Sequence, residues 1–187
     1  MRRIVFILLI IVIAVLVGIA LSHKRNDPVA QPLERRTDDH VNVTLVRVGP
    51  QAAYPKPELT PGAIDPNVTE QDIDDTICVP HYTATVRPSS AVTRRLKLDL
   101  MRTYAISGEP SDYELDHFIP LELGGCSDCV ANLWPEPYEG DFGAREKDIV
   151  ENHLHHLVCK HAITLSDAQA AIVRDWVQIY LEMHTSR

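Results

Sequence analysis

Residues 113–120 read Tyr-Glu-Leu-Asp-His-Phe-Ile-Pro, a Gly-Gly pair stands at 124–125, and residues 132–135 read Asn-Leu-Trp-Pro. Asp116 and His117 therefore lie where a short apolar segment meets a loop. An imidazole can take a proton from water near neutral pH, and a neighbouring carboxylate can hold a divalent cation. The pair is thus typical of a metal-dependent hydrolase. The alternative is a structural histidine in a loop, with Asp116 as a strand cap.

The local patterns around this stretch predict an α+β domain with little sheet. Strands are expected at residues 114–118 and 132–134, and Pro135, Pro137 and Gly140 are expected to end the second one. The other expected elements are a short helix at 69–76, a strand at 82–86, helices at 89–104 and 143–159, and a final helix that Ser166 and Gln169 begin with a capping box.

The chain begins with an apolar run at residues 4–21 that follows two arginines. At a rise of about 1.5 Å per residue, such a helix comes close to the roughly 30 Å of a bilayer core. We expect residues 1–22 to form a retained transmembrane anchor, with a cleaved signal segment as the alternative. Residues 23–58 are polar and proline-bearing and predict a disordered linker, which leaves residues 59–187 as the folded domain.

The four cysteines indicate an exported domain. Small domains in oxidising compartments commonly pair their cysteines, so we expect the disulfides Cys78–Cys159 and Cys126–Cys129. A structural zinc site and free thiols are the alternatives. Together with the N-terminal segment, the cysteines place the expected soluble domain outside the cytoplasm.

The net charge of −8 argues against a protein that coats nucleic acid, because phosphate binding depends on Lys and Arg. It does not argue against a nuclease. The region from 79 to 105 is locally basic, and we assign nucleic-acid contact to Arg87, Arg94 and Arg95. The alternative interpretation of this stripe is a solvated helix face.

The order strand, loop, strand, helix, with Asp-His at the end of the first strand, resembles the ββα-metal core of HNH nucleases. The segment Asp116-His117-x-x-Pro120-x-x-x-Gly124-Gly125 followed by Asn132-Leu133 is similar to the first two motif segments of that family. The chain also resembles a group of small exported bacterial proteins with an HNH-like core. Besides the central motif, the shared phrases are Pro61-Gly62-Ala63, Thr76-Ile77-Cys78-Val79, Thr85-Val86-Arg87-Pro88 and Asn132-Leu133-Trp134-Pro135.

The resemblance, which covers about residues 58–187, implies a small ββα-metal core with additional packing helices. It also implies that His117 is the general base that activates water for attack on a phosphodiester. Asp116 would help to bind one divalent cation. Asn132 would tie the loop together and orient His117 rather than bind metal.

The expected helix at 143–159 departs from the family pattern. In place of the usual motif it carries Lys147-Asp148-x-x-Glu151-x-x-x-His155. Glu151 and His155 are four residues apart and can meet one ion, so they are expected to complete the metal site with Asp116. Lys147 is expected either to contact phosphate or to pair with Glu151.

The resemblance implies an HNH-like endonuclease that uses one divalent metal ion (Mg²⁺, Mn²⁺ or Zn²⁺) and takes DNA or RNA as its substrate. The N-terminal helix would attach the domain to the membrane. The rival hypothesis is a non-catalytic, disulfide-stabilised envelope module that binds a partner with the same scaffold. The net negative charge and the altered helix motif favour this rival.

Overall fold

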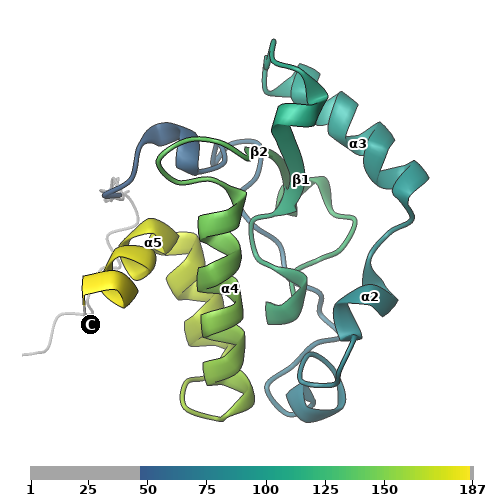
Figure 1. The fold of residues 1–187 in the computed structure, drawn as a ribbon. Coiled ribbons are helices and arrows are strands. Elements are labelled where there is room, and N and C mark those ends of the chain that lie inside the picture. Colours follow the sequence, from purple (N-terminus) through teal and green to yellow (C-terminus); the bar gives the residue numbers. More distant parts are fainter. Residues whose placement is uncertain (1–46, 186–187) are drawn as a thin grey trace, which may run out of the picture. The chain divides into compact units, whose positions relative to one another are not determined.

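A two-stranded antiparallel sheet and the helices around it make up the fold (Figure 1). The computed structural model describes residues 47–185 of the chain. Its helices and strands, with 3₁₀ helices written η, are η1 (Gln51–Ala53), η2 (Ile73–Asp75), α2 (Tyr82–Val86), α3 (Ser90–Thr103), η3 (Pro110–Asp112), β1 (Tyr113–His117), η4 (Leu121–Leu123), η5 (Val130–Asn132), β2 (Leu133–Pro137), α4 (Ala144–Cys159) and α5 (Leu165–Thr185). The α+β class with a small sheet, expected from the sequence, is confirmed.

The sheet pairs β1 with β2 so that Asp116 lies opposite Trp134 and His117 lies opposite Leu133. Pro135 lies inside β2 and Pro137 is its last residue, so the expectation that Pro135 ends the strand is wrong. Two residues apart, they have their nitrogens on the same side, and a strand with one neighbour can turn that side outward, where no donor is needed.

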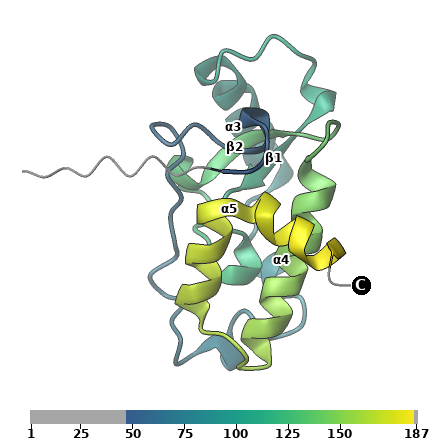
Figure 2. The same cartoon turned by 90° about the vertical axis from the view of Figure 1, so that its left-hand side faces the viewer.

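The helices pack on the sheet and on each other. Helix α3 packs against both strands, whereas α4 and α5 pack side by side (Figure 1, Figure 2). Trp134 and Phe118 centre one apolar cluster, which includes side chains of α3. Trp176 of α5 belongs to a second cluster, which includes Val150 and Leu154 of α4. The strand β2 thus packs in one apolar cluster and α4 in the other. The end of β1 faces α4.

The folded unit begins earlier than residue 59. Ala53 and Tyr54 are buried, and the indole nitrogen of Trp176 donates a hydrogen bond of 2.8 Å to the carbonyl oxygen of Ala53. The expectation of a disordered linker is therefore wrong for residues 47–58. These residues are polar and rich in proline on average, but Ala53 and Tyr54 are buried and both hydrogen-bond to residues of α5.

Residues 82–86 form helix α2 and not the expected strand. Thr85 donates its hydroxyl to the carbonyl oxygen of Tyr82, and Arg87 donates its backbone N–H to Thr83, so the local polar groups are satisfied within the turn. β-Branched residues favour strands mainly because they pack on a pleated neighbour. Among the described residues this segment has no such neighbour.

Two further helix expectations need correction. At 69–76 only the short η2 forms. Helix α5 begins at Leu165, and its side-chain cap is Thr164, whose hydroxyl oxygen accepts the N–H of Asp167 at 3.0 Å. Ser166 therefore lies in the first turn. The helices expected at 89–104 and 143–159 and the strand at 114–118 agree with α3, α4 and β1 to within two residues.

The expected anchor at residues 1–22 and the first part of the expected linker lie outside the described residues. Among residues 47–185, no helix has both the length and the apolar content required to cross a lipid bilayer.

Candidate functional site

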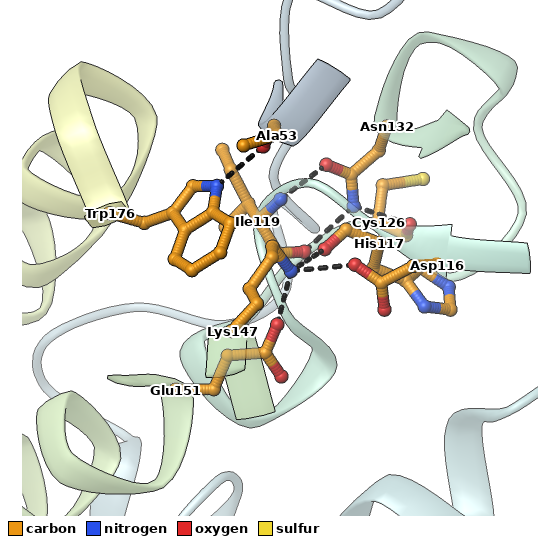
Figure 3. Close-up of polar contacts among 9 residues, drawn as sticks. All are labelled: Ala53, Asp116, His117, Ile119, Cys126, Asn132, Lys147, Glu151 and Trp176. Carbon is orange, nitrogen blue, oxygen red and sulfur yellow. Dashed lines mark hydrogen bonds and ion pairs between the residues drawn. The ribbon is translucent and has the colours of Figure 1, made fainter. Parts of the chain in front are cut away.

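The end of β1, the loop that follows it and the first half of α4 meet at one buried centre (Figure 3). Lys147 of α4 lies in the middle of it and is fully buried. Its ammonium donates to Asp116 Oδ2 at 2.6 Å, to the carbonyl oxygen of His117 at 2.9 Å, and to Glu151 Oε1. An ammonium has three N–H donors. All three are used, so Lys147 has no donor left for a phosphate, and the expected nucleic-acid contact of this residue is wrong.

The charges of this centre depend on one another. Burial alone would lower the pKa of Lys147, but the carboxyl groups of Asp116, Glu151 and Glu136 raise it well above its usual value. The residue is therefore an ammonium. Burial acts to raise the pKa of Asp116, and the charge of Lys147 outweighs it, so that this pKa is lowered and Asp116 is a carboxylate. Burial raises the pKa of Glu151 to about 8, with Lys147 opposing the shift.

Glu136 is a second buried carboxyl group that the sequence reasoning missed. It lies on β2, two residues after the partner of Asp116, and successive alternate residues of a strand share a face. Its side chain is fully buried, and neither oxygen makes a hydrogen bond of ordinary geometry with another described residue. Burial and the charge of Asp116 raise its pKa well above the usual value. An acid between two prolines in an apolar strand was the available signal.

His117 ends β1 and is buried. Its Nε2 lies 3.0 Å from the carbonyl oxygen of Ser127. Because a carbonyl oxygen can only accept, Nε2 carries the proton and Nδ1 keeps its lone pair. Burial lowers the pKa of His117, although the Ser127 bond and the charge of Asp116 oppose the shift. The imidazole is therefore neutral at pH 7 and can act as a base.

Asn132 holds the loop that carries Ser127. Its Nδ2 donates to the carbonyl oxygens of Ile119 at 2.9 Å and Cys126 at 3.0 Å, and its Oδ1 accepts the N–H of Ile119 at 2.9 Å and of Ala63 at 3.3 Å. The amide therefore acts on the loop and not on the imidazole itself. Its effect on His117 runs through the backbone between Cys126 and Ser127.

The Gly-Gly pair permits this close packing. Gly124 adopts a φ of 71°, which favours glycine. A Cβ atom on Gly125 would lie 1.8 Å from the carbonyl oxygen of Ile119. Any side chain there would push apart the two segments that Asn132 joins.

The expected metal ligands Asp116, Glu151 and His155 do not come together around one ion. His155 lies at the other end of the helix face, with Nε2 at 2.9 Å from the carbonyl oxygen of Ile77 and 3.3 Å from Cys159 Sγ. Asp116 and Glu151 do meet, but around the ammonium of Lys147. Helical spacing predicts which side chains lie on the same face of a helix. It does not predict which of them lies at the centre of a site.

A divalent ion does not fit the donor set at this centre. Hard cations require several oxygen ligands in direct contact, and here the carboxyl groups of Asp116 and Glu151 already hold the ammonium of Lys147. Among residues 47–185, groups of three potential ligand side chains converge only at the two cysteine pairs. Those sulfurs are joined as disulfides and are not free to bind metal.

Both expected disulfides, Cys78–Cys159 and Cys126–Cys129, are present, and the described residues contain no free cysteine. The alternatives of a cysteine-bound zinc ion and of free thiols are therefore not supported. The first disulfide joins the segment after η2 to the last residue of α4. The second closes the turn that presents the Ser127 carbonyl to His117. Crosslinks of this kind are typical of an oxidising compartment.

The basic residues assigned to nucleic acid are spread over the surface. Arg94 and Arg95 are exposed on α3, and Arg87 is exposed just after α2. The charge of Arg87 reaches the candidate site: burial raises the pKa of Glu114 and Asp148, and Arg87 opposes both shifts. The centre is thus surrounded by carboxyl groups, with one arginine close to them.

Comparison of the chain with models of protein families, with curated proteins and with solved structures finds no match in any of the three. The geometry of the site is that of a buried histidine, His117, beside the ion pair of Lys147 and Asp116.

Proposed function

We propose that the domain is an HNH-like hydrolase of nucleic-acid phosphodiester bonds, with His117 as the general base. The observation that carries the proposal is the hydrogen bond from His117 Nε2 to the Ser127 carbonyl oxygen. It fixes the tautomer in which Nδ1 is the base. The order β1, loop, β2, α4 and the place of the histidine at the end of β1 support the same assignment.

In this mechanism Nδ1 of His117 takes a proton from water, and the resulting hydroxide attacks phosphorus. The bond to the leaving oxygen breaks, and that oxygen takes up a proton from solvent. The imidazolium that forms is stabilised by the Ser127 carbonyl oxygen and by the negative charge of Asp116. Arg87 is the exposed cation whose charge reaches the site, and we assign it to the substrate phosphate.

The proposed place of action is outside the cytoplasm, with residues 1–22 as a membrane anchor. The two disulfides support this placement because such bonds persist in oxidising compartments.

A second candidate function is a non-catalytic binding module. The observation in its favour is that the three donors of Lys147 are all satisfied inside the protein, so that its ammonium is not offered to a phosphodiester. On this view Asp116, Glu151 and Lys147 stabilise a scaffold whose partner binds elsewhere.

A cleavage assay separates the two candidates. The purified protein is incubated with plasmid DNA and with single-stranded RNA, in EDTA and in Mg²⁺, Mn²⁺ or Zn²⁺. The test variant is His117→Ala, and the matched control is His156→Ala, which removes an exposed imidazole from α4. Cleavage that is lost only in His117→Ala supports the hydrolase. Cleavage that survives this substitution refutes the role of His117, and no cleavage under any condition favours the binding module.

A further inference from the structure

We propose that the ammonium of Lys147 takes the place of a divalent cation at this centre, so that the domain binds no resident metal there while the lysine is present. The inference concerns the site of the proposed hydrolase, but it does not depend on catalysis. It predicts that the oxygen atoms of this centre bind the ammonium of Lys147, and that they bind a metal ion when a metal-binding side chain such as histidine replaces the lysine.

The three oxygen atoms that accept from Lys147 come from two elements of the fold. Asp116 comes from β1, the carbonyl oxygen of His117 comes from the end of the same strand, and Glu151 lies one helical turn after Lys147 on α4. These oxygen atoms converge on one point from two elements, which is how proteins hold a hard cation. The cation at that point is Nζ of Lys147.

The buried ammonium of Lys147 excludes a divalent ion from the same oxygen atoms. The side chain of Lys147 is 1% exposed, and those of Asp116 and Glu151 are 14% and 12% exposed. A divalent ion that used the same carboxyl oxygens of Asp116 and Glu151 would lie within a few ångströms of the ammonium, in a region with little water to screen the repulsion. Binding would therefore require the lysine to leave and to lose all three of its hydrogen bonds.

A histidine side chain at position 147 is shorter than the lysine side chain by about the length of a metal–nitrogen bond. An imidazole at position 147 would extend in the same direction as the lysine and end roughly 2 Å short of the present Nζ position, and 2.0–2.1 Å is about the length of a bond from a histidine nitrogen to zinc. A metal ion at the Nζ position would then touch that imidazole, Asp116 and Glu151. Lys147→His should therefore convert the ammonium site into a zinc site.

Isothermal titration calorimetry with Zn²⁺ alone, and separately with Mn²⁺ alone, tests the proposal on the purified full chain. The wild type and Asp116→Asn should bind each metal with equal affinity, because any binding would come from surface histidines. Lys147→His should bind Zn²⁺ at least about tenfold more tightly than the wild type, and adding Asp116→Asn to it should remove the gain.

Three results would overturn the proposal. One is stoichiometric binding of Zn²⁺ or Mn²⁺ to the wild type that Asp116→Asn abolishes. Another is a Lys147→His variant that folds, by circular dichroism, without any gain in Zn²⁺ affinity. The third is a Lys147→His variant that stays unfolded with saturating Zn²⁺, because a metal would then be unable to fill the place of the ammonium. The Tm of the wild type should change between EDTA and Zn²⁺ by the same amount as the Tm of Asp116→Asn. None of these measurements reads cleavage, so a failure of the proposed hydrolase leaves them interpretable.

Discussion

Replacing Asn132 by Asp exchanges one NH₂ group for an oxygen and leaves the shape of the side chain unchanged. The amide is fully buried, and its NH₂ group donates to the carbonyl oxygens of Ile119 and Cys126 at 2.9 and 3.0 Å. In Asn132→Asp both carbonyl oxygens lose their donor and face a negatively charged oxygen. A buried polar group left unsatisfied costs about 1–3 kcal/mol, so we expect a loss of roughly 3–5 kcal/mol in the free energy of unfolding at pH 7.5.

The same substitution should make stability depend on pH. In the folded state the new carboxyl group would have a pKa above its unfolded value of about 3.9, because its protonated form can donate to one of the two carbonyl oxygens. A raised carboxyl pKa contributes stability that is present below the unfolded pKa and is lost as pH rises toward the folded pKa. The difference between Asn132→Asp and the wild type should therefore be smaller at pH 4.5 than at pH 7.5.

Urea unfolding followed by tryptophan fluorescence measures both effects, since Trp134 and Trp176 are buried. The matched control is Asn152→Asp, which makes the same chemical change on the exposed face of α4 and should cost less than about 1 kcal/mol. Equal losses in Asn132→Asp and Asn152→Asp at pH 7.5 would refute the assignment of Asn132 as the clamp of the loop.

The remaining predictions concern the disulfides and the buried acid. Replacing Cys78 and Cys159 by serine should lower the free energy of unfolding by about 4–5 kcal/mol, and replacing Cys126 and Cys129 should lower it by about 2 kcal/mol. The first disulfide closes a span of 81 residues and the second a span of 3, so loss of the first frees more chain entropy in the unfolded state. Urea unfolding of the two double variants measures both losses, and the reverse order would contradict the prediction. Burial raises the pKa of Glu151 to about 8, so the stability of the wild type relative to Glu151→Gln should fall as pH rises from about 4.5 to about 8. A difference between these two proteins that is independent of pH over that window would show that the carboxyl group is not shifted.

The sequence was sufficient for the elements that carry the site. The short apolar segment before Pro120 predicts β1. The apolar spacing between 143 and 159 predicts α4, because burial of one helix face dictates that period. The Gly-Gly pair marks a backbone that tolerates no side chain, as the contact at Gly125 shows. The pairing of the cysteines also agrees with the expectation.

The sequence was misleading where the outcome depended on contacts with distant parts of the chain and not on local residue preferences. Residues 82–86 carry β-branched side chains and still form α2, because no strand lies beside them among the described residues. Residues 47–58 look like a linker in composition, yet Ala53 accepts the hydrogen bond of Trp176 and is buried. In both cases the outcome depends on a surface supplied by another part of the chain.

The candidate site divides in the same way. The sequence alone determined that Asp116 and His117 stand at the end of a strand and that Lys147 and Glu151 share a helix face, because these relations follow from the periods of strand and helix. Only the tertiary structure decided that Lys147 occupies the centre and that His155 does not reach it. The ammonium can be buried only because oxygen atoms 30 and 31 residues away in the sequence come to meet it, and the free energy of a buried charge depends on such partners and not on its own helix.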